Sequence, residues 1–330
     1  MCTGLSLKNG QNHYFGRNLD LEIDYPVSVT ITPRNVELNF RHVPAMSSHY
    51  AMIGMGLNEG GYPLYFEAIN EKGLGIAGLA FWTSCKYYPV EEGKTNVASF
   101  EVMPYLLGKC ANVAEVKEAI KDFNITDDSF APHYPPSPLH WLVSDEKESI
   151  VMESSKEHGF KVYQNPYDVL TNEPEFPFHV NNLSFYPNVS NKLHHFNSTR
   201  FAPDFPGFIK FGAGMGSAGL PGGLDSASRF VRVAFARLNS ICPDTEEANV
   251  SQFFHILQTV IQVNGSDQVK ENEYEVTQYT CGANTKTLRF YYTTYYNPSL
   301  NAVDLMKEDL DADKVKTIPL IRDLQVNLQN

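Results

Sequence analysis

The first residues of the chain alternate between small and large side chains, which is the pattern of a β-strand. Residues 2–7 read Cys-Thr-Gly-Leu-Ser-Leu, so the larger side chains fall on one face and the small ones, beginning with Cys2, fall on the other. The pair Asn9-Gly10 is typical of a hairpin turn and would return residues 13–20 alongside this strand. We therefore predict a half-buried hairpin whose large residues face a core and whose small residues face an open space.

The remaining pattern predicts many short strands and a few helices. Asn112 and Glu115 form a capping sequence before an amphipathic segment that runs to Phe123, which predicts a helix there. Apolar periodicity predicts further helices at residues 225–238 and 249–263. Strands are predicted at residues 27–32, 65–69, 74–81, 139–144, 149–154, 160–163, 168–172, 277–281 and 287–296. Because the helices fall between groups of antiparallel strands, we expect an α+β fold of stacked layers with sheet in the middle.

The composition is that of a globular protein with one domain. The 330 residues are 42% hydrophobic, and no change in composition marks a second unit, so we expect a single domain over residues 1–330. A net charge of −12 argues against nucleic acid or an anionic membrane surface as a partner, because both bind clustered lysine and arginine. The sequence has no charged leader followed by an apolar run and no stretch of about 18 apolar residues. We therefore expect a cytoplasmic protein.

Neither the cysteines nor the glycine motifs indicate a metal or a cofactor. The five cysteines form no CxxC pair and have no metal-ligand spacing with histidine, so we expect no disulfide framework and no metal site. Residues 73–78 and 214–219 match GxGxxG, but neither segment lies between a strand and the start of a helix, as a phosphate cradle requires. We expect turns and close backbone packing at these glycines, and no cofactor.

Cys2 is the strongest candidate for chemistry because it directly follows Met1. Met-Cys-Thr-Gly is a start from which the methionine can be removed, and its removal would place a thiol and an α-amino group on one residue. The amine could then act as the base for its own side chain. The predicted hairpin brings Arg17 and Asp20 back beside Cys2, where the arginine would favour the thiolate and the carboxylate would hold the ammonium or the arginine. The alternative for these two residues is a surface ion pair, which stabilises little.

Five segments of the chain carry a family resemblance: residues 1–4, 15–20, 69–75, 169–172 and 228–230. In this order they resemble the choloylglycine hydrolase family, which contains the bile salt hydrolases and the penicillin V acylases. The resemblance extends over nearly the whole chain. It implies the four-layer αββα fold of N-terminal nucleophile hydrolases, with two antiparallel sheets between helix layers, and it also implies a homotetramer.

The resemblance also implies roles for individual residues. Cys2 is the expected nucleophile, with Arg17 and Asp20 as its charge partners, and Asn172 matches an oxyanion-hole side chain. A side-chain amide donates to a developing oxyanion without adding a titrating group. Arg229 matches a further arginine of the site, for which a structural salt bridge and a direct substrate contact are equally expected.

The activity implied by the resemblance is hydrolysis of the amide bond of glycine- or taurine-conjugated bile salts. The alternatives are a penicillin V acylase or another small N-acyl amide hydrolase, and a non-catalytic binding protein that keeps the fold. Residues on or beside candidate rim loops, among them the proline-rich segment 131–138, are expected to form an apolar pocket for the steroid. These residues are Leu19, Tyr25, Tyr62, Phe66, Phe81, Phe130 and Leu139, with Ala80 as a further substrate contact.

Ala80 departs from the family pattern, because bile salt hydrolases usually carry Asn at this position and penicillin V acylases often carry Tyr. If the backbone N–H of Ala80 contributes to the oxyanion hole, catalysis tolerates the alanine. If the usual side chain orients the leaving amino acid, recognition is weaker. The segment Gly212-Ala-Gly214 resembles a loop of relatives that favour glycine conjugates, which predicts a preference for glycine over taurine.

Overall fold

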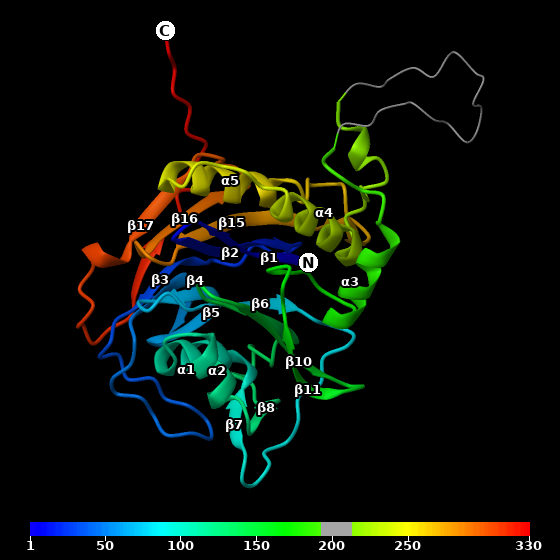
Figure 1. Ribbon diagram of the computed structural model, residues 1–330. Coiled ribbons are helices and arrows are strands. Elements are labelled where there is room, and N and C mark those ends of the chain that lie inside the picture. The colour runs from blue at the N-terminus through cyan, green and yellow to red at the C-terminus, as the bar shows by residue number, and fades with distance from the viewer. Residues whose placement is uncertain (193–212) are drawn as a thin grey trace, which may run out of the picture.

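The computed structural model describes residues 1–192 and 213–330, which form four stacked layers (Figure 1). Two β-sheets lie face to face in the middle. Helices α4 (Ser226–Leu238) and α5 (Glu246–Gln258) cover the outer face of one sheet, while α1 (Val102–Lys109) and α2 (Val113–Ala119) cover the outer face of the other. This arrangement confirms the predicted α+β fold, an αββα sandwich.

The first sheet has six strands in the order β12-β1-β2-β15-β16-β17, and neighbouring strands are antiparallel. The predicted first hairpin is present, and in its register Cys2 lies opposite Leu19 and Gly4 lies opposite Arg17. Gly10 in the turn has a φ of 56°, a left-handed conformation that glycine adopts without strain. The strands of this sheet are β1 (Cys2–Asn9), β2 (Asn12–Leu21), β12 (Val169–Leu170), β15 (Val276–Asn284), β16 (Arg289–Thr294) and β17 (Asn301–Asp304).

The second sheet has eight antiparallel strands in the order β11-β10-β9-β6-β5-β4-β3-β18. Its strands are β3 (Ser28–Thr32), β4 (Met52–Glu59), β5 (Tyr62–Asn70), β6 (Gly75–Ala80), β9 (Leu139–Ser144), β10 (Ser149–Ser155), β11 (Gly159–Gln164) and β18 (Lys316–Pro319). Two small strand pairs are separate from the sheets, namely β7 (Thr95–Ala98) with β8 (Phe123–Thr126) and β13 (Gln268–Lys270) with β14 (Glu273–Tyr274). The short helices are α3 (Phe176–Asn182), η1 (Ser99–Glu101), η2 (Leu183–Phe185), η3 (Met215–Ser217) and η4 (Leu305–Lys307).

The first strand is buried on both faces, which corrects the prediction of a half-buried strand with one open face. A Cβ added at Gly4 would lie 3.1 Å from Leu142 Cδ2 and 3.6 Å from Leu79 Cδ1, so the second sheet packs directly on the small-residue face of β1. The large residues of β1 pack beneath α4 and α5. The small side chains therefore make room for a neighbouring sheet, and the open space is confined to the Cys2 end of the strand.

The predicted helices are present, but two of them have different bounds. Asp225 caps α4 by accepting a hydrogen bond from the Ser228 N–H at 2.9 Å. The helix predicted at residues 112–123 ends at Ala119, because the chain turns there to enter β8, and the helix predicted at residues 249–263 is α5, which begins and ends earlier.

Helices α1 and α3 were not predicted. Seven of the eight residues of α1 are buried, so its sequence has no polar face that would reveal a helical period. Within the described ranges, no helix has both the length and the apolar character that crossing a bilayer requires.

Candidate active site

The Cys2 end of β1 opens into a cavity between the two sheets. Residues of β2 that share a face with Cys2 also line this cavity, because side chains alternate along a strand and Cys2 is paired with Leu19. Arg17 lies two residues before Leu19 and so projects from the same face as the thiol. The cavity encloses about 200 Å³, and Cys2 and Arg17 lie together in its wall.

Most of the predicted pocket residues do line this cavity. The second sheet and the segment before β9 supply the wall that faces β2, and the proline-rich segment 131–138 contributes to it as expected. The predicted residues in the wall are Leu19, Tyr25, Phe66, Ala80, Phe130 and Leu139.

Two predicted pocket residues lie behind the wall. Phe81 is fully buried and stacks on His140, with ring centroids 4.4 Å apart. Tyr62 packs against Phe100 and Phe130 at centroid distances of 6.0 and 5.7 Å, and it supports those rings from outside the cavity. Neither residue therefore lines the cavity, and Tyr62 acts on its shape by packing against Phe100 and Phe130.

The backbone nitrogen of Cys2 is fixed by a side chain from the neighbouring strand end. It donates a hydrogen bond to Asn172 Oδ1 at 2.8 Å. While Met1 is present this nitrogen belongs to a peptide bond, and the α-amino group of Met1 donates to Asp20 O at 2.5 Å and pairs with Glu275. Removal of Met1 would therefore leave the new amine within hydrogen-bond distance of Asn172.

Asn172 connects Cys2 to both sheets. Its side-chain oxygen accepts from Cys2 N and from Arg229 Nη2 at 2.7 Å, while its Nδ2 donates to Ala80 O at 2.8 Å. Two donors on one side fix which end of the amide is oxygen. An amide nitrogen carries two N–H groups, and the contact with Ala80 uses one of them. The Asn172 backbone is held in turn by Ser226 Oγ at 2.8 Å.

Arg229 lies beneath β1, on the helix side of the sheet. From α4 it donates to Cys2 O at 2.5 Å, to Thr3 Oγ1 at 2.7 Å and to Asn172 Oδ1 at 2.7 Å. It is fully buried and does not line the cavity, and burial lowers the pKa of this guanidinium below its usual value although Asp20 acts in the opposite direction. The geometry therefore favours a structural role for Arg229 over a direct substrate contact, but through hydrogen bonds to uncharged acceptors, since no salt bridge of Arg229 is present among the described residues.

Asp20 also lies on the helix side, on the face of β2 opposite Arg17. Its Oδ1 accepts from Thr277 Oγ1 at 2.6 Å, and Oδ2 is buried with no hydrogen-bond partner among the described residues. Burial raises the pKa of this carboxyl, while the positive charges of Arg229 and the N-terminal amine lower it. Asp20 therefore lies close to the chain terminus, as predicted, and no ion pair with Arg17 is present in the described part of the chain.

Arg17 is held on three sides and directed towards the cavity. Its Nη1 donates to Gly78 O, its Nε donates to Asn18 O at 3.2 Å, and Nε lies 3.6 Å from Glu67 Oε2. The remaining nitrogen, Nη2, is buried and has no hydrogen-bond partner within the described ranges. Burial would lower the pKa of Arg17, but the negative charges of Cys2, Tyr279 and Glu67 in their ionised forms outweigh burial and raise it.

In this four-layer αββα fold, the Cys2 thiol and a buried arginine share one cavity wall, which is the arrangement that the sequence resemblance implied. Residues 2–318 match the family model for linear amide C–N hydrolases of the choloylglycine hydrolase family. The chain belongs to the choloylglycine hydrolase family. It is therefore an amide hydrolase, and the cavity at Cys2 is its candidate active site.

Two relatives and one more distant structure show how far the similarity extends. The chain is 45% identical to the bile salt hydrolase/transferase of Lactiplantibacillus plantarum, with 98% of both chains covered. A crystal structure of a variant of the conjugated bile acid hydrolase from Clostridium perfringens superposes on this chain with a TM-score of 0.91. The two sequences are 38% identical, and both chains are fully covered. The penicillin V acylase from Agrobacterium tumefaciens shares the fold. Its structure gives a TM-score of 0.76 at 17% sequence identity, with 97% of this chain and 91% of that chain covered.

Several residues in or behind the cavity wall were not predicted from the sequence. Phe100 and Met103 line the cavity from η1 and α1, and both elements lack a clear sequence signal. Trp82 stands at the rim with 65% of its surface exposed, directly after the predicted strand that contains Ala80. Glu67 is fully buried behind Arg17, where an alternating strand pattern gives no reason to expect a carboxylate.

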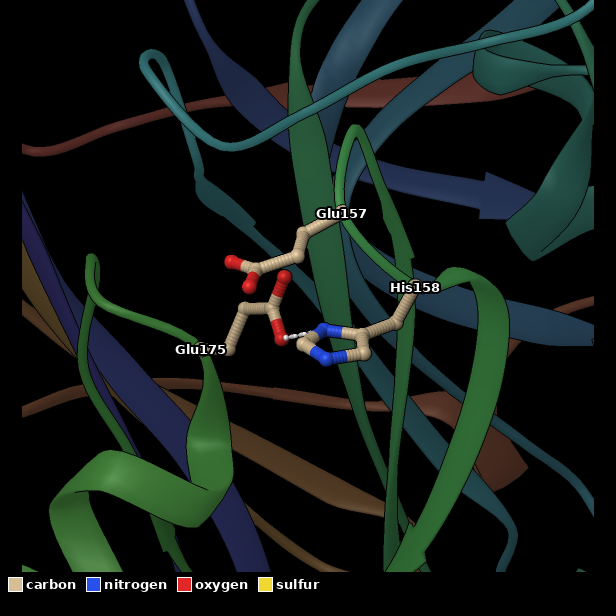
Figure 2. Close-up of side chains that lie close together, drawn as sticks. All are labelled: Glu157, His158 and Glu175. Atoms are coloured by element: carbon tan, nitrogen blue, oxygen red, sulfur yellow. Dashed lines mark hydrogen bonds and ion pairs between the residues drawn. The ribbon is translucent and has the colours of Figure 1, made fainter.

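One cluster outside the cavity has a set of side chains that could bind a metal. Figure 2 shows Glu157 and His158, from the turn between β10 and β11, beside Glu175, which precedes α3. The ligand atoms lie within 4.8 Å of one another, and His158 Nδ1 lies 2.6 Å from Glu175 Oε2. Glu157 and His158 are exposed, His158 pairs with Glu175, and none of the three lines the cavity, so the cluster is separate from the candidate active site.

Replacing Arg229 tests whether its role is structural. We expect Arg229→Ala to lower the free energy of unfolding by about 3 kcal/mol or more, because three buried acceptors lose a charged donor. Arg229→Lys should recover part of the loss, since an ammonium cannot reach all three acceptors. Urea denaturation measures both effects, and Arg232→Ala, on the same helix with one contact to Gly223 O, is the matched control. An unchanged unfolding midpoint with lost activity would instead show that Arg229 acts on substrate.

Proposed function

We propose that this amide hydrolase cleaves glycine- or taurine-conjugated bile salts through Cys2 as an N-terminal nucleophile. One observation carries the proposal: a thiol and an arginine lie in the wall of a cavity that is otherwise mainly aliphatic and aromatic. A conjugated bile salt has a matching distribution, with an apolar steroid, an amide bond and an anionic end. The names of the relatives from Lactiplantibacillus plantarum and Clostridium perfringens support the same substrate class.

The first step is maturation. Removal of Met1 converts the Cys2 nitrogen from a peptide nitrogen, which is not basic, into an amine. Asn172 Oδ1 is already placed to accept a hydrogen bond from this nitrogen, and Arg229 holds the Cys2 carbonyl. The amine then takes the thiol proton, and the positive charge of Arg17 stabilises the resulting thiolate.

The second step is acyl transfer to the thiolate. Sulfur attacks the amide carbonyl carbon, an S–C bond forms, and the carbonyl electron pair moves to oxygen. The second N–H of Asn172 Nδ2 donates to this oxyanion. The tetrahedral intermediate collapses with cleavage of the C–N bond, and the Cys2 ammonium gives its proton to the departing glycine or taurine nitrogen.

The third step returns the enzyme to its starting state. The Cys2 amine takes a proton from water as the oxygen attacks the thioester carbonyl. The C–S bond breaks, the bile acid leaves, and the amine and thiolate share the remaining proton as before. This sequence uses groups of the chain and water, and it requires no metal or cofactor.

Assembly and location are also proposals. We propose a homotetramer on the strength of the family resemblance, together with a single catalytic domain and a location in the cytoplasm. Light scattering coupled to size-exclusion chromatography tests the tetramer, and a mass equal to one chain would contradict it.

Activity should depend on an amine at Cys2. Expression with a cleavable leader before Cys2, in place of Met1, gives a form in which the Cys2 nitrogen remains a peptide nitrogen. We expect this form to be folded but inactive, and cleavage of the leader should restore glycine release from glycocholate. The control is the Cys2→Ala variant in its uncleaved and cleaved forms, and both forms should be inactive. Full activity before cleavage would refute the proposed proton transfer.

Replacing Arg17 tests whether its charge activates the thiol. We expect Arg17→Ala to move the pH midpoint of Cys2 alkylation upwards by about one unit, because a positive charge beside the thiolate is lost. Arg17→Lys should restore part of the effect, since an ammonium cannot reproduce the planar contacts with Gly78 O and Asn18 O. Mass spectrometry of the iodoacetamide-labelled peptides measures the rates, and the partly exposed Cys242 is an internal reference. Identical profiles would show that Arg17 is structural.

The substrate class is tested by competing substrates. We expect the mature enzyme to have a higher kcat/KM for glycocholate than for penicillin V, since the cavity wall suits a broad apolar body. Ala80→Asn should raise bile salt turnover more than penicillin turnover, because it adds an amide in the cavity wall. A higher kcat/KM for penicillin V would replace the bile salt proposal with an acylase. Rapid labelling of Cys2 without cleavage of either compound would indicate another N-acyl amide, and slow labelling would indicate a binding protein.

The preference for glycine over taurine is a separate proposal. It rests on the segment Gly212-Ala-Gly214, and Gly212 lies outside the described residues. Equal rates for glycocholate and taurocholate would remove this preference and leave the substrate class intact.

A further inference from the structure

Behind Arg17, on the side away from the cavity, lies a carboxylate that the proposed reaction does not use. Glu67, from β5 of the second sheet, has 1% of its surface exposed, and its Oε2 lies 3.6 Å from Arg17 Nε. Glu67 does not line the cavity, whereas Arg17 does. The guanidinium therefore lies near a buried carboxylate and also lines the cavity wall that contains Cys2.

Two further groups from the opposite sheet hold Glu67 in place. Tyr279 OH lies 2.9 Å from Oε2 and 3.2 Å from Oε1, and Cys281 Sγ lies 3.2 Å from Oε1. Both come from β15, the neighbour of β2 in the first sheet. Burial raises the pKa of Tyr279 and of Cys281 well above their usual values, so both are neutral donors to the carboxylate near neutral pH.

Arg17 is the one cation that faces Glu67 within the described ranges. The ionisable groups that the first sheet places against Glu67 are Arg17 from β2 and Tyr279 and Cys281 from β15. The flanking strands of its own sheet present Met55 of β4 and Ala77 of β6, neither of which has an ionisable side chain. Burial raises the pKa of Glu67 to about 7, although the charge of Arg17 acts in the opposite direction.

We infer that Glu67 is a positioning residue that sets how much of the Arg17 charge acts on the Cys2 thiolate. The inference rests on the proposed nucleophile. An ionised Glu67 pairs with the guanidinium and offsets part of its positive charge, so the thiolate is stabilised less. A protonated Glu67 is neutral and leaves the whole charge to act on Cys2. In both states Arg17 Nε can keep its hydrogen bond to Asn18 O, and Nη2 has no hydrogen-bond partner among the described residues.

The test is the pH profile of Cys2 alkylation in Glu67→Gln, measured on the mature enzyme by mass spectrometry. Glutamine keeps the shape of the side chain and cannot ionise, so it imitates the protonated state over the whole pH range. We expect the alkylation midpoint to move to lower pH by about half a unit to one unit, the opposite direction to Arg17→Ala. Tyr279→Phe, which keeps the carboxylate but removes a donor that favours its charged form, should move the midpoint in the same direction by a smaller amount.

Matched controls separate this effect from a general loss of structure. Glu101→Gln changes another carboxylate with 1% exposure, whose contacts are the Arg41 and Ala98 backbone N–H groups, and it should leave the Cys2 midpoint unchanged. Cys242, held by Asn9 and Asn249, is the internal reference for alkylation in every sample. Urea denaturation establishes that each variant is folded, and if Glu67→Gln is unfolded, Tyr279→Phe decides the question.

The outcome is independent of the substrate, because alkylation requires no bile salt. An unchanged or raised midpoint in folded Glu67→Gln would overturn the positioning role while leaving the proposed hydrolysis intact. A lowered midpoint in an enzyme that fails to cleave glycocholate would support the positioning role and refute the substrate. If Cys2 reacts no faster than Cys242, both the proposed nucleophile and the role of Glu67 are wrong.

Discussion

The site depends on the burial of the first strand between a sheet and a helix layer. The first residues of a chain usually fray, because nothing fixes them on one side. Here β1 is an inner strand of the first sheet, flanked by β12 and β2, and the second sheet covers the face that carries Cys2. Asn172 accepts from the nitrogen of Cys2 and Arg229 donates to its carbonyl oxygen. The residue that we propose as the N-terminal nucleophile is thereby held in place like a core residue.

The alternation of side chains along β2 separates two kinds of electrostatic environment. Arg17 faces the cavity and the thiol, whereas Asp20 faces the helix layer and the terminal amine. The sheet itself lies between these two side chains. The expectation that the Asp20 carboxylate holds the ammonium or the arginine stays a prediction, because the contact with the Met1 amine is made by the Asp20 backbone oxygen and the carboxylate accepts from Thr277.

The sequence predicted those parts of the site that depend on local pattern. The hairpin signal at Asn9-Gly10 and a period of two were enough to place Arg17 on the same face as Cys2. Burial of β1 on both faces was not predictable, because alternating small and large residues suit an exposed face as well as a face in contact with another sheet. Phe81 was assigned to the pocket as a residue on or beside a candidate rim loop, but its ring is buried against His140 behind the cavity wall.

The role of Glu67 was not predicted for a different reason. A carboxylate in a buried strand can be explained only when its partners from the other sheet are known. Those partners, Arg17 and Tyr279, are far from it in the sequence and come from two other strands. Similarly, α1 is apolar on nearly all sides, and such a segment cannot be distinguished by its period from a buried strand. Long-range contacts, which no local pattern contains, decide these features.

The charge of the site is the last consequence of burial. The protein has a net charge of −12, yet two arginines and three carboxyl groups surround the terminus: Arg17, Arg229, Asp20, Glu67 and Glu275. Burial raises the pKa of each of these carboxyl groups, while the positive charges beside them act in the opposite direction. The arginines keep their charge even when buried. The cavity wall that contains Cys2 also contains Arg17 and has no carboxylate among its described residues, which favours a thiolate and an anionic substrate there over the acidic bulk of the surface.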